Sequence, residues 1–133
     1  MKFNKWTLAL AAVAMLAIAG CGTTPPAKYS TQIFNAEKLA VDSAANATSG
    51  FNLYYHTATN GVSEADLARL ESARLQIYAA DRDMSKAVAV LEGLRQAYVA
   101  NSADTNKTAL DAGLVAVQSQ SSNIVGLVKQ FSK

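Results

Sequence analysis

Residues 64–100 read EADLARLESARLQIYAADRDMSKAVAVLEGLRQAYVA. Apolar and small residues recur here every three or four positions: Leu67, Leu70, Ala73, Ile77, Ala80, Met84, Ala87, Leu91, Leu94 and Tyr98. This spacing predicts one amphipathic helix with a continuous apolar face. At 1.5 Å per residue the helix would be about 55 Å long. Ser63 is positioned to cap its first turn, with Asp66 three positions on.

Charged pairs mark the other side of this helix. An acid precedes a base by three positions in Asp66–Arg69, Glu71–Arg74, Asp83–Lys86 and Glu92–Arg95. Each pair adds only about 0.2–0.5 kcal/mol, but their regularity indicates a solvated face. Arg74 and Asp81 lie seven positions apart at the border of the apolar face. They form either an ion pair that fixes the register or part of the solvated flank.

A second helix is predicted upstream, over about residues 30–59, with Ser30 as N-cap and Tyr29 and Phe34 as a hydrophobic staple. Its apolar face contains Ile33, Ala40, Ala44, Ala47, Phe51, Tyr54 and Ala58, and a flanking line contains Phe34, Val41, Thr48 and Tyr55. Asn60-Gly61 ends the helix, because glycine suits the left-handed position that follows a helix.

A third helix is predicted downstream, over about residues 105–131, with Asp104 as its cap. Its apolar stripe is Leu110, Leu114, Val117, Ser121, Ile124, Val128 and Phe131. Residues 118–123 are all polar, so we expect this part to bury little surface and to be the weakest part of the fold.

Three such helices joined by short turns predict an all-α, elongated, antiparallel three-helix bundle over residues 30–133. The near-heptad spacing favours long, nearly parallel packing, so the domain would be a rod. The face of the first helix is rich in alanine and serine and buries little area per residue. A core this light predicts a protein partner or a homo-oligomer.

The chain begins with Lys2, Lys5 and a short apolar run, which is the pattern of a secretory signal. The run ends Ile18-Ala19-Gly20-Cys21, which resembles the lipobox of bacterial lipoproteins. The resemblance implies that residues 1–20 are cleaved and that the Cys21 thiol carries a diacylglyceryl group, with an N-acyl chain in many Gram-negative bacteria. A transmembrane helix needs roughly 20 apolar residues, more than this run has, and an ordinary cleaved signal would leave an unexplained free thiol.

The lipobox resemblance also implies a place for the protein. Two or more acyl chains hold a protein stably on a bilayer. Enterobacterial lipoproteins that stay at the inner membrane usually have Asp after the cysteine, whereas Gly22 stands here. We therefore expect an outer-membrane lipid anchor facing the periplasm, with the inner membrane or another cell-surface lipid anchor as the alternative. Residues 21–29 contain Pro25-Pro26 and would form an extended tether.

Composition argues against several functions. About 113 of the 133 residues remain after signal cleavage, and ten basic residues then face ten acidic ones. A neutral domain has no net field that attracts nucleic acid. His56 is the only histidine and lacks a readable nucleophile or set of metal ligands nearby. We expect no enzyme, no cofactor, no metal site, no nucleic-acid partner and no small-molecule substrate.

The resulting expectation is a non-catalytic, lipid-anchored envelope protein that acts as a periplasmic helical spacer or protein-interaction module. Tyr54, Tyr55 and Tyr98 are candidate interface residues, because aromatic side chains anchor many interfaces. The chain ends in Lys133, which is similar to murein lipoprotein, whose terminal lysine is joined to peptidoglycan; cell-wall attachment through Lys133 is one alternative. A prophage- or plasmid-encoded factor acting in lysis or superinfection exclusion is another.

Overall fold

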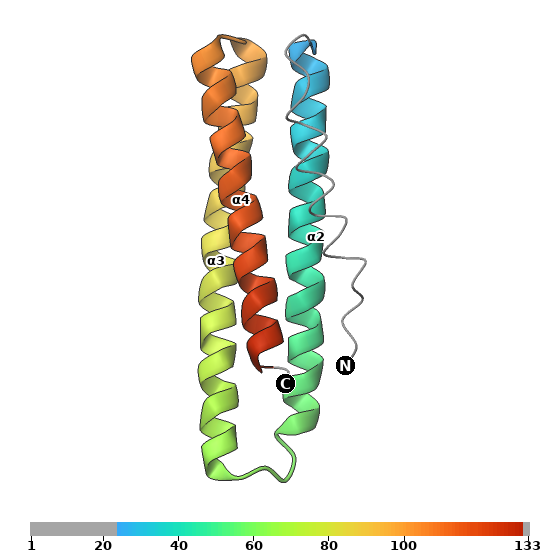
Figure 1. The fold of residues 1–133 in the computed structure, drawn as a ribbon, viewed down its shortest axis with the longest axis vertical. Coiled ribbons are helices and arrows are strands. Elements are labelled where there is room, and N and C mark those ends of the chain that lie inside the picture. The colour runs from blue at the N-terminus through green and yellow to red at the C-terminus, as the bar shows by residue number, and fades with distance from the viewer. Residues whose placement is uncertain (1–23, 132–133) are drawn as a thin grey trace.

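The computed structural model describes residues 24–131. Three helices, α2 (Pro26–Ala58), α3 (Glu64–Ala100) and α4 (Asp104–Phe131), account for nearly all of this part. They lie side by side along one long axis and alternate in direction (Figure 1). The predicted all-α, three-helix fold is therefore confirmed. We call the end with Pro26 and the α3–α4 connection the proximal end, and the end with the α2–α3 turn the distal end.

The boundaries of α3 agree with the sequence pattern. The Ser63 side chain accepts a hydrogen bond of 3.2 Å from the backbone N–H of Asp66, which is the predicted cap. Before this helix, Gly61 has φ 84°, the left-handed conformation expected after α2. The predicted apolar face is largely buried, but Leu67 is 40% exposed. α4 has 28 residues and α3 has 37, so α4 ends before the level of the α2–α3 turn (Figure 1) and the start of α3 extends beyond it.

The start of α2 differs from the prediction. The helix begins at Pro26 with Pro25 as N-cap, so Ser30 is a buried residue inside the helix and not its cap. A proline is compatible with the first helical position because its missing N–H has no partner there in any helix. Within residues 24–131, the expected tether therefore keeps only residues 24 and 25 outside the helix.

Tyr29 is consequently a core residue and not half of a staple. Its ring meets the ring of Tyr98 edge-on, with 5.6 Å between the centroids. Its hydroxyl donates a hydrogen bond to Asp111 on α4. Burial raises the Tyr29 pKa, and this hydrogen bond raises it further. Phe34, the other expected staple residue, is 43% exposed. One aromatic pair thus joins α2 to α3 and reaches α4 at the proximal end.

The polar stretch of α4 is packed, contrary to the expectation that it buries little. Gln118 and Ser121 are both buried. The Ser121 hydroxyl donates a 2.7 Å hydrogen bond to the backbone carbonyl of Ala40 on α2. The alanines of α2 make this possible, because a small side chain lets a second helix approach its backbone. The core therefore continues past this stretch, toward Ile124 and Val128.

Candidate interaction surface

One seam of the rod is built from two lines of residues that repeat every seven positions. The α2 line is Phe34, Val41, Thr48 and Tyr55, and the α3 line is Arg95, Val88, Asp81 and Arg74. Three of the four opposed pairs are in direct contact. The Arg95 guanidinium lies 5.0 Å from the Phe34 ring centroid, Thr48 bonds Asp81, and Arg74 lies 5.5 Å from the Tyr55 ring centroid. We call this surface the α2–α3 seam.

A groove opens at the middle of the seam. Its volume is about 480 Å³, and its lining residues are Val41, Ala44, Ala45, Thr48, Ser49, Asp81, Met84, Ser85 and Val88. Among the three helix pairs, α2 and α3 contact each other least, whereas α4 packs closely on both. Short side chains at Ala45 and Ser49 on α2 and at Ser85 on α3 leave the groove walls low. The groove is thus a shallow, largely apolar depression on the side of the α2–α3 pair.

Asp81 is the acidic residue of this groove. Its two carboxylate oxygens share one bifurcated hydrogen bond from the Thr48 hydroxyl, with 3.2 Å to each oxygen. Partial burial raises the Asp81 pKa, and the bond from Thr48 opposes that rise. The ion pair considered between Arg74 and Asp81 is not formed. Arg74 pairs with Glu71 instead, with 3.0 Å between Nε and Oε2.

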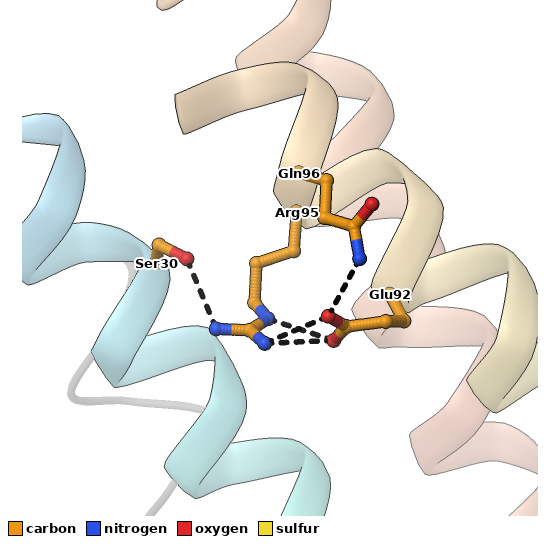
Figure 2. Close-up of polar contacts among 4 residues, drawn as sticks. All are labelled: Ser30, Glu92, Arg95 and Gln96. Carbon is orange, nitrogen blue, oxygen red and sulfur yellow. Dashed lines mark hydrogen bonds and ion pairs between the residues drawn. The ribbon is translucent and has the colours of Figure 1, made fainter. Parts of the chain in front are cut away.

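The proximal end of the seam has a second polar cluster, shown in Figure 2. Arg95 makes a bidentate ion pair with Glu92, with a shortest distance of 2.8 Å, and its other nitrogen donates to the Ser30 hydroxyl at 3.4 Å. Arg95 lowers the Glu92 pKa through these hydrogen bonds. Gln96 donates a further bond of 3.1 Å to Glu92. The cluster therefore ties α3 to α2.

Glu37 lies beside this cluster and was not predicted as a polar core residue. Its side chain is 7% exposed, and its Oε2 atom has no hydrogen-bond partner among residues 24–131. Burial raises the Glu37 pKa, the Glu92 charge raises it further, and Arg95 partly offsets both effects. The signal in the sequence was its position, four residues after Ile33 and three before Ala40, on the apolar face of α2.

The structure separates the three candidate interface tyrosines. Tyr54 and Tyr55 are half-buried near the distal end, and the Tyr55 hydroxyl donates to Glu71 on α3. Tyr98 is buried against Tyr29, so its assignment to an exposed interface was wrong. In the sequence, the spacing of apolar residues every three or four positions already placed Tyr98 on the apolar face of α3. Cys21 and Lys133 lie outside the described residues, and their roles stay predictions.

Apolar side chains are exposed around the distal end. Leu53 is 65% exposed, and Val62 and Leu67 are also exposed there. His56 is exposed on the same part of α2, with its ring edge-on to Tyr55. Among residues 24–131, no group of three or more histidine, cysteine or acidic side chains is arranged to hold a metal ion. This end is therefore a candidate for protein contact through apolar surface.

Comparisons with protein-family models, with curated proteins and with solved structures each gave no match for this chain. Within residues 24–131, no helix has the length and the apolar character needed to cross a bilayer.

Proposed function

We propose that the chain is a non-catalytic lipoprotein of a bacterial envelope. Acyl chains on Cys21 hold it on the outer membrane, and its helical rod carries an interaction surface into the periplasm. The lipobox-like sequence Ile18-Ala19-Gly20-Cys21 supports the anchor. The observation that carries the spacer role is the start of α2 at Pro26, only five residues after Cys21. Five residues span at most about 18 Å, so the proximal end would stay near the lipid.

The length of the rod then sets the position of the distal end. The 37 residues of α3 extend over about 55 Å. Exposed Leu53, Val62 and Leu67 gather at the end that would be farthest from the membrane, beside half-buried Tyr54 and Tyr55. We propose that this distal end binds another envelope protein. Tyr98 has no part in this surface because it is buried.

A photo-crosslinking amino acid at Leu53 tests this distal contact in intact cells. The control position is Val115, which is exposed and apolar but lies on α4. We expect one discrete adduct from position 53, none from position 115, and loss of the adduct when Tyr54→Ala is added. The same adducts from both positions, or an adduct that Tyr54→Ala leaves unchanged, would contradict binding at the distal end.

The direction of α4 favours attachment of Lys133 to the cell wall as a second function. This helix runs away from the proximal end, and its 28 residues cover about 42 Å (Figure 1). Lys133 follows Phe131 by two positions, so it would be presented far from the lipid. Digested sacculi should then release a muropeptide joined to the Lys133 amine, and sacculi without it would refute this attachment.

A further inference from the structure

The α2–α3 groove is a surface that the proposed function does not use. We propose that it receives the same groove of a second copy of this chain, so that two rods pack side by side about a two-fold axis parallel to their length. In this arrangement α2 of one copy lies against α3 of its partner. The inference goes beyond the proposed function and does not depend on the lipid at Cys21.

Heights along the rod determine which residues would meet. Contacts within one chain show that Phe34 and Arg95 lie at equal height, as do Thr48 and Asp81. A two-fold axis along the rod preserves height. Residues at equal height on α2 and α3 of one chain therefore face each other between the two copies. Opposed positions that miss equal height by one residue are about 1.5 Å apart along the rod, which is small compared with a side chain.

Outer positions along the seam, at the groove and seven residues to either side of it, match under this rule. On α2 the outward positions are Lys38, Ala45 and Asn52, and on α3 at the same heights they are Glu92, Ser85 and Tyr78. A lysine would thus face a glutamate, an alanine would face a serine, and an asparagine would face a tyrosine. The short pair at the centre permits close approach of the helices. Of the two flanking pairs, lysine with glutamate is a charge contact and asparagine with tyrosine is a polar contact.

Charge complementarity places a cation of the partner at Glu92. Glu92 is paired with Arg95 of its own chain, and its side chain is still 38% exposed, so a second cation reaches it from outside. Lys38 is the basic residue at this height on the facing edge. Among residues 24–131 Lys38 pairs only with Asp42, and both side chains are more than half exposed. Such an exposed pair contributes little and is readily exchanged.

Several apolar side chains are exposed on this surface of the single chain, which agrees with a surface that is covered in a dimer. Phe34 and Tyr78 are both 43% exposed, although each lies under an arginine at the edge of the seam. Val41 and Val88 line the groove and are only half-buried. Pairing two grooves would cover these side chains. It would also supply the additional burial that the alanine-rich face of α2 lacks.

Disulfide trapping between two different full-length chains tests the proposal. One chain carries Ala45→Cys and the other, with a different tag, carries Ser85→Cys; both are made in the same cells and oxidised in whole cells without fractionation. We expect a covalent dimer that contains both tags, and no dimer above the wild-type background when either variant is present alone. Wild-type chains that carry the two tags measure any disulfide formed through Cys21, and this background is subtracted. Absence of the mixed dimer, or equal crosslinking of Ser85→Cys with itself, overturns the parallel arrangement.

A height-shifted pair provides the matched control. Asn52→Cys with Ser85→Cys is offset by seven residues, about 10 Å along the rod. We expect no mixed dimer from this pair, and crosslinking as strong as that of the matched pair overturns the proposed register.

Charge reversal tests the lysine–glutamate contact without a disulfide. Lys38→Glu places a third acid beside Glu37 and Glu92 of the partner, and the two-fold axis repeats the change. We expect the dimer in mild detergent to dissociate about tenfold more readily, whereas Lys38→Arg stays dimeric. Circular dichroism checks that both variants remain helical. A wild-type particle that contains one copy, or one copy with a different protein in the groove, overturns the proposal.

Discussion

Replacement of Glu37 by methionine is expected to stabilise the fold. Glu37 lies on the buried face of α2, with a side chain that is 7% exposed and one carboxylate oxygen without a hydrogen-bond partner in residues 24–131. Methionine has a similar length and a similar helix propensity, and it fills irregular spaces in a core. The substitution removes the buried polar group while it keeps most of the volume. The ion pair of Arg95 with Glu92 stays in place.

The magnitude follows from the desolvation of an unpaired group. A buried polar group without a partner costs about 1–3 kcal/mol, so Glu37→Met should raise the free energy of unfolding at neutral pH by about that amount. Burial raises the Glu37 pKa in the folded chain, so the folded state holds a proton that the unfolded chain releases. The wild type therefore loses stability as pH rises from the ordinary glutamate pKa through the raised one. The advantage of the methionine variant should grow over the same range.

Urea unfolding of the full chain, followed by the helical circular dichroism signal, measures this difference at about pH 4 and about pH 7.5. Asn35→Met is the matched control, because Asn35 is exposed on the same helix. It should change stability by no more than about 0.5 kcal/mol. The reasoning is refuted if Glu37→Met is no more stable than the wild type at neutral pH, or if its advantage is the same in acid.

Three further substitutions test other parts of the structure. Asp81→Asn should raise the melting temperature at neutral pH and have less effect in acid, because burial raises the Asp81 pKa; equal effects at both pH values would contradict this. Tyr98→Ala should cost about 3–5 kcal/mol in urea unfolding, because it removes a buried ring packed against Tyr29, and a loss below 1 kcal/mol would argue for an exposed Tyr98. Gly126→Ala should stabilise α4 by about 0.5–1 kcal/mol, because a Cβ there meets no atom within 4 Å; thermal denaturation that shows destabilisation would contradict the open space.

The sequence was most informative for α3. Its cap at Ser63, its acid–base pairs and its apolar period all indicate the same element, and the structure has its boundaries where the pattern put them. Such agreement between local signals is what makes an element predictable. The α2–α3 turn was equally clear, because Gly61 must adopt the left-handed conformation that ends a helix.

Features that depend on neighbouring helices were not predictable in the same way. Pro26 was placed in an extended tether, although the first helical position accepts proline. The polar stretch of α4 was expected to bury little, and yet Ser121 is satisfied by a carbonyl of α2 that no local pattern reveals. Leu67 follows the apolar period but stays exposed, because it lies in the first turn of the 37-residue α3, and α4 has only 28 residues to cover that helix.

The candidate surface shows the same division. The α2 line through Phe34, Val41, Thr48 and Tyr55 was visible as a heptad in the sequence. Its partner line on α3 was seen only as the spacing of Arg74 and Asp81. Which of these residues meet depends on the height at which two antiparallel helices pack, and that height is set by the whole interface. The groove and the unpaired carboxylate of Glu37 therefore required the three-dimensional structure.

Metabolic labelling with a clickable palmitate tests the proposed anchor most directly. Cells that express the wild-type chain should yield a labelled protein in the membrane fraction. A Cys21→Ser variant should carry no label and leave that fraction, because a hydroxyl does not accept the thioether-linked lipid. An unlabelled wild type, or a label that survives the serine substitution, would show that this helical rod is not held by a lipid on that sulfur.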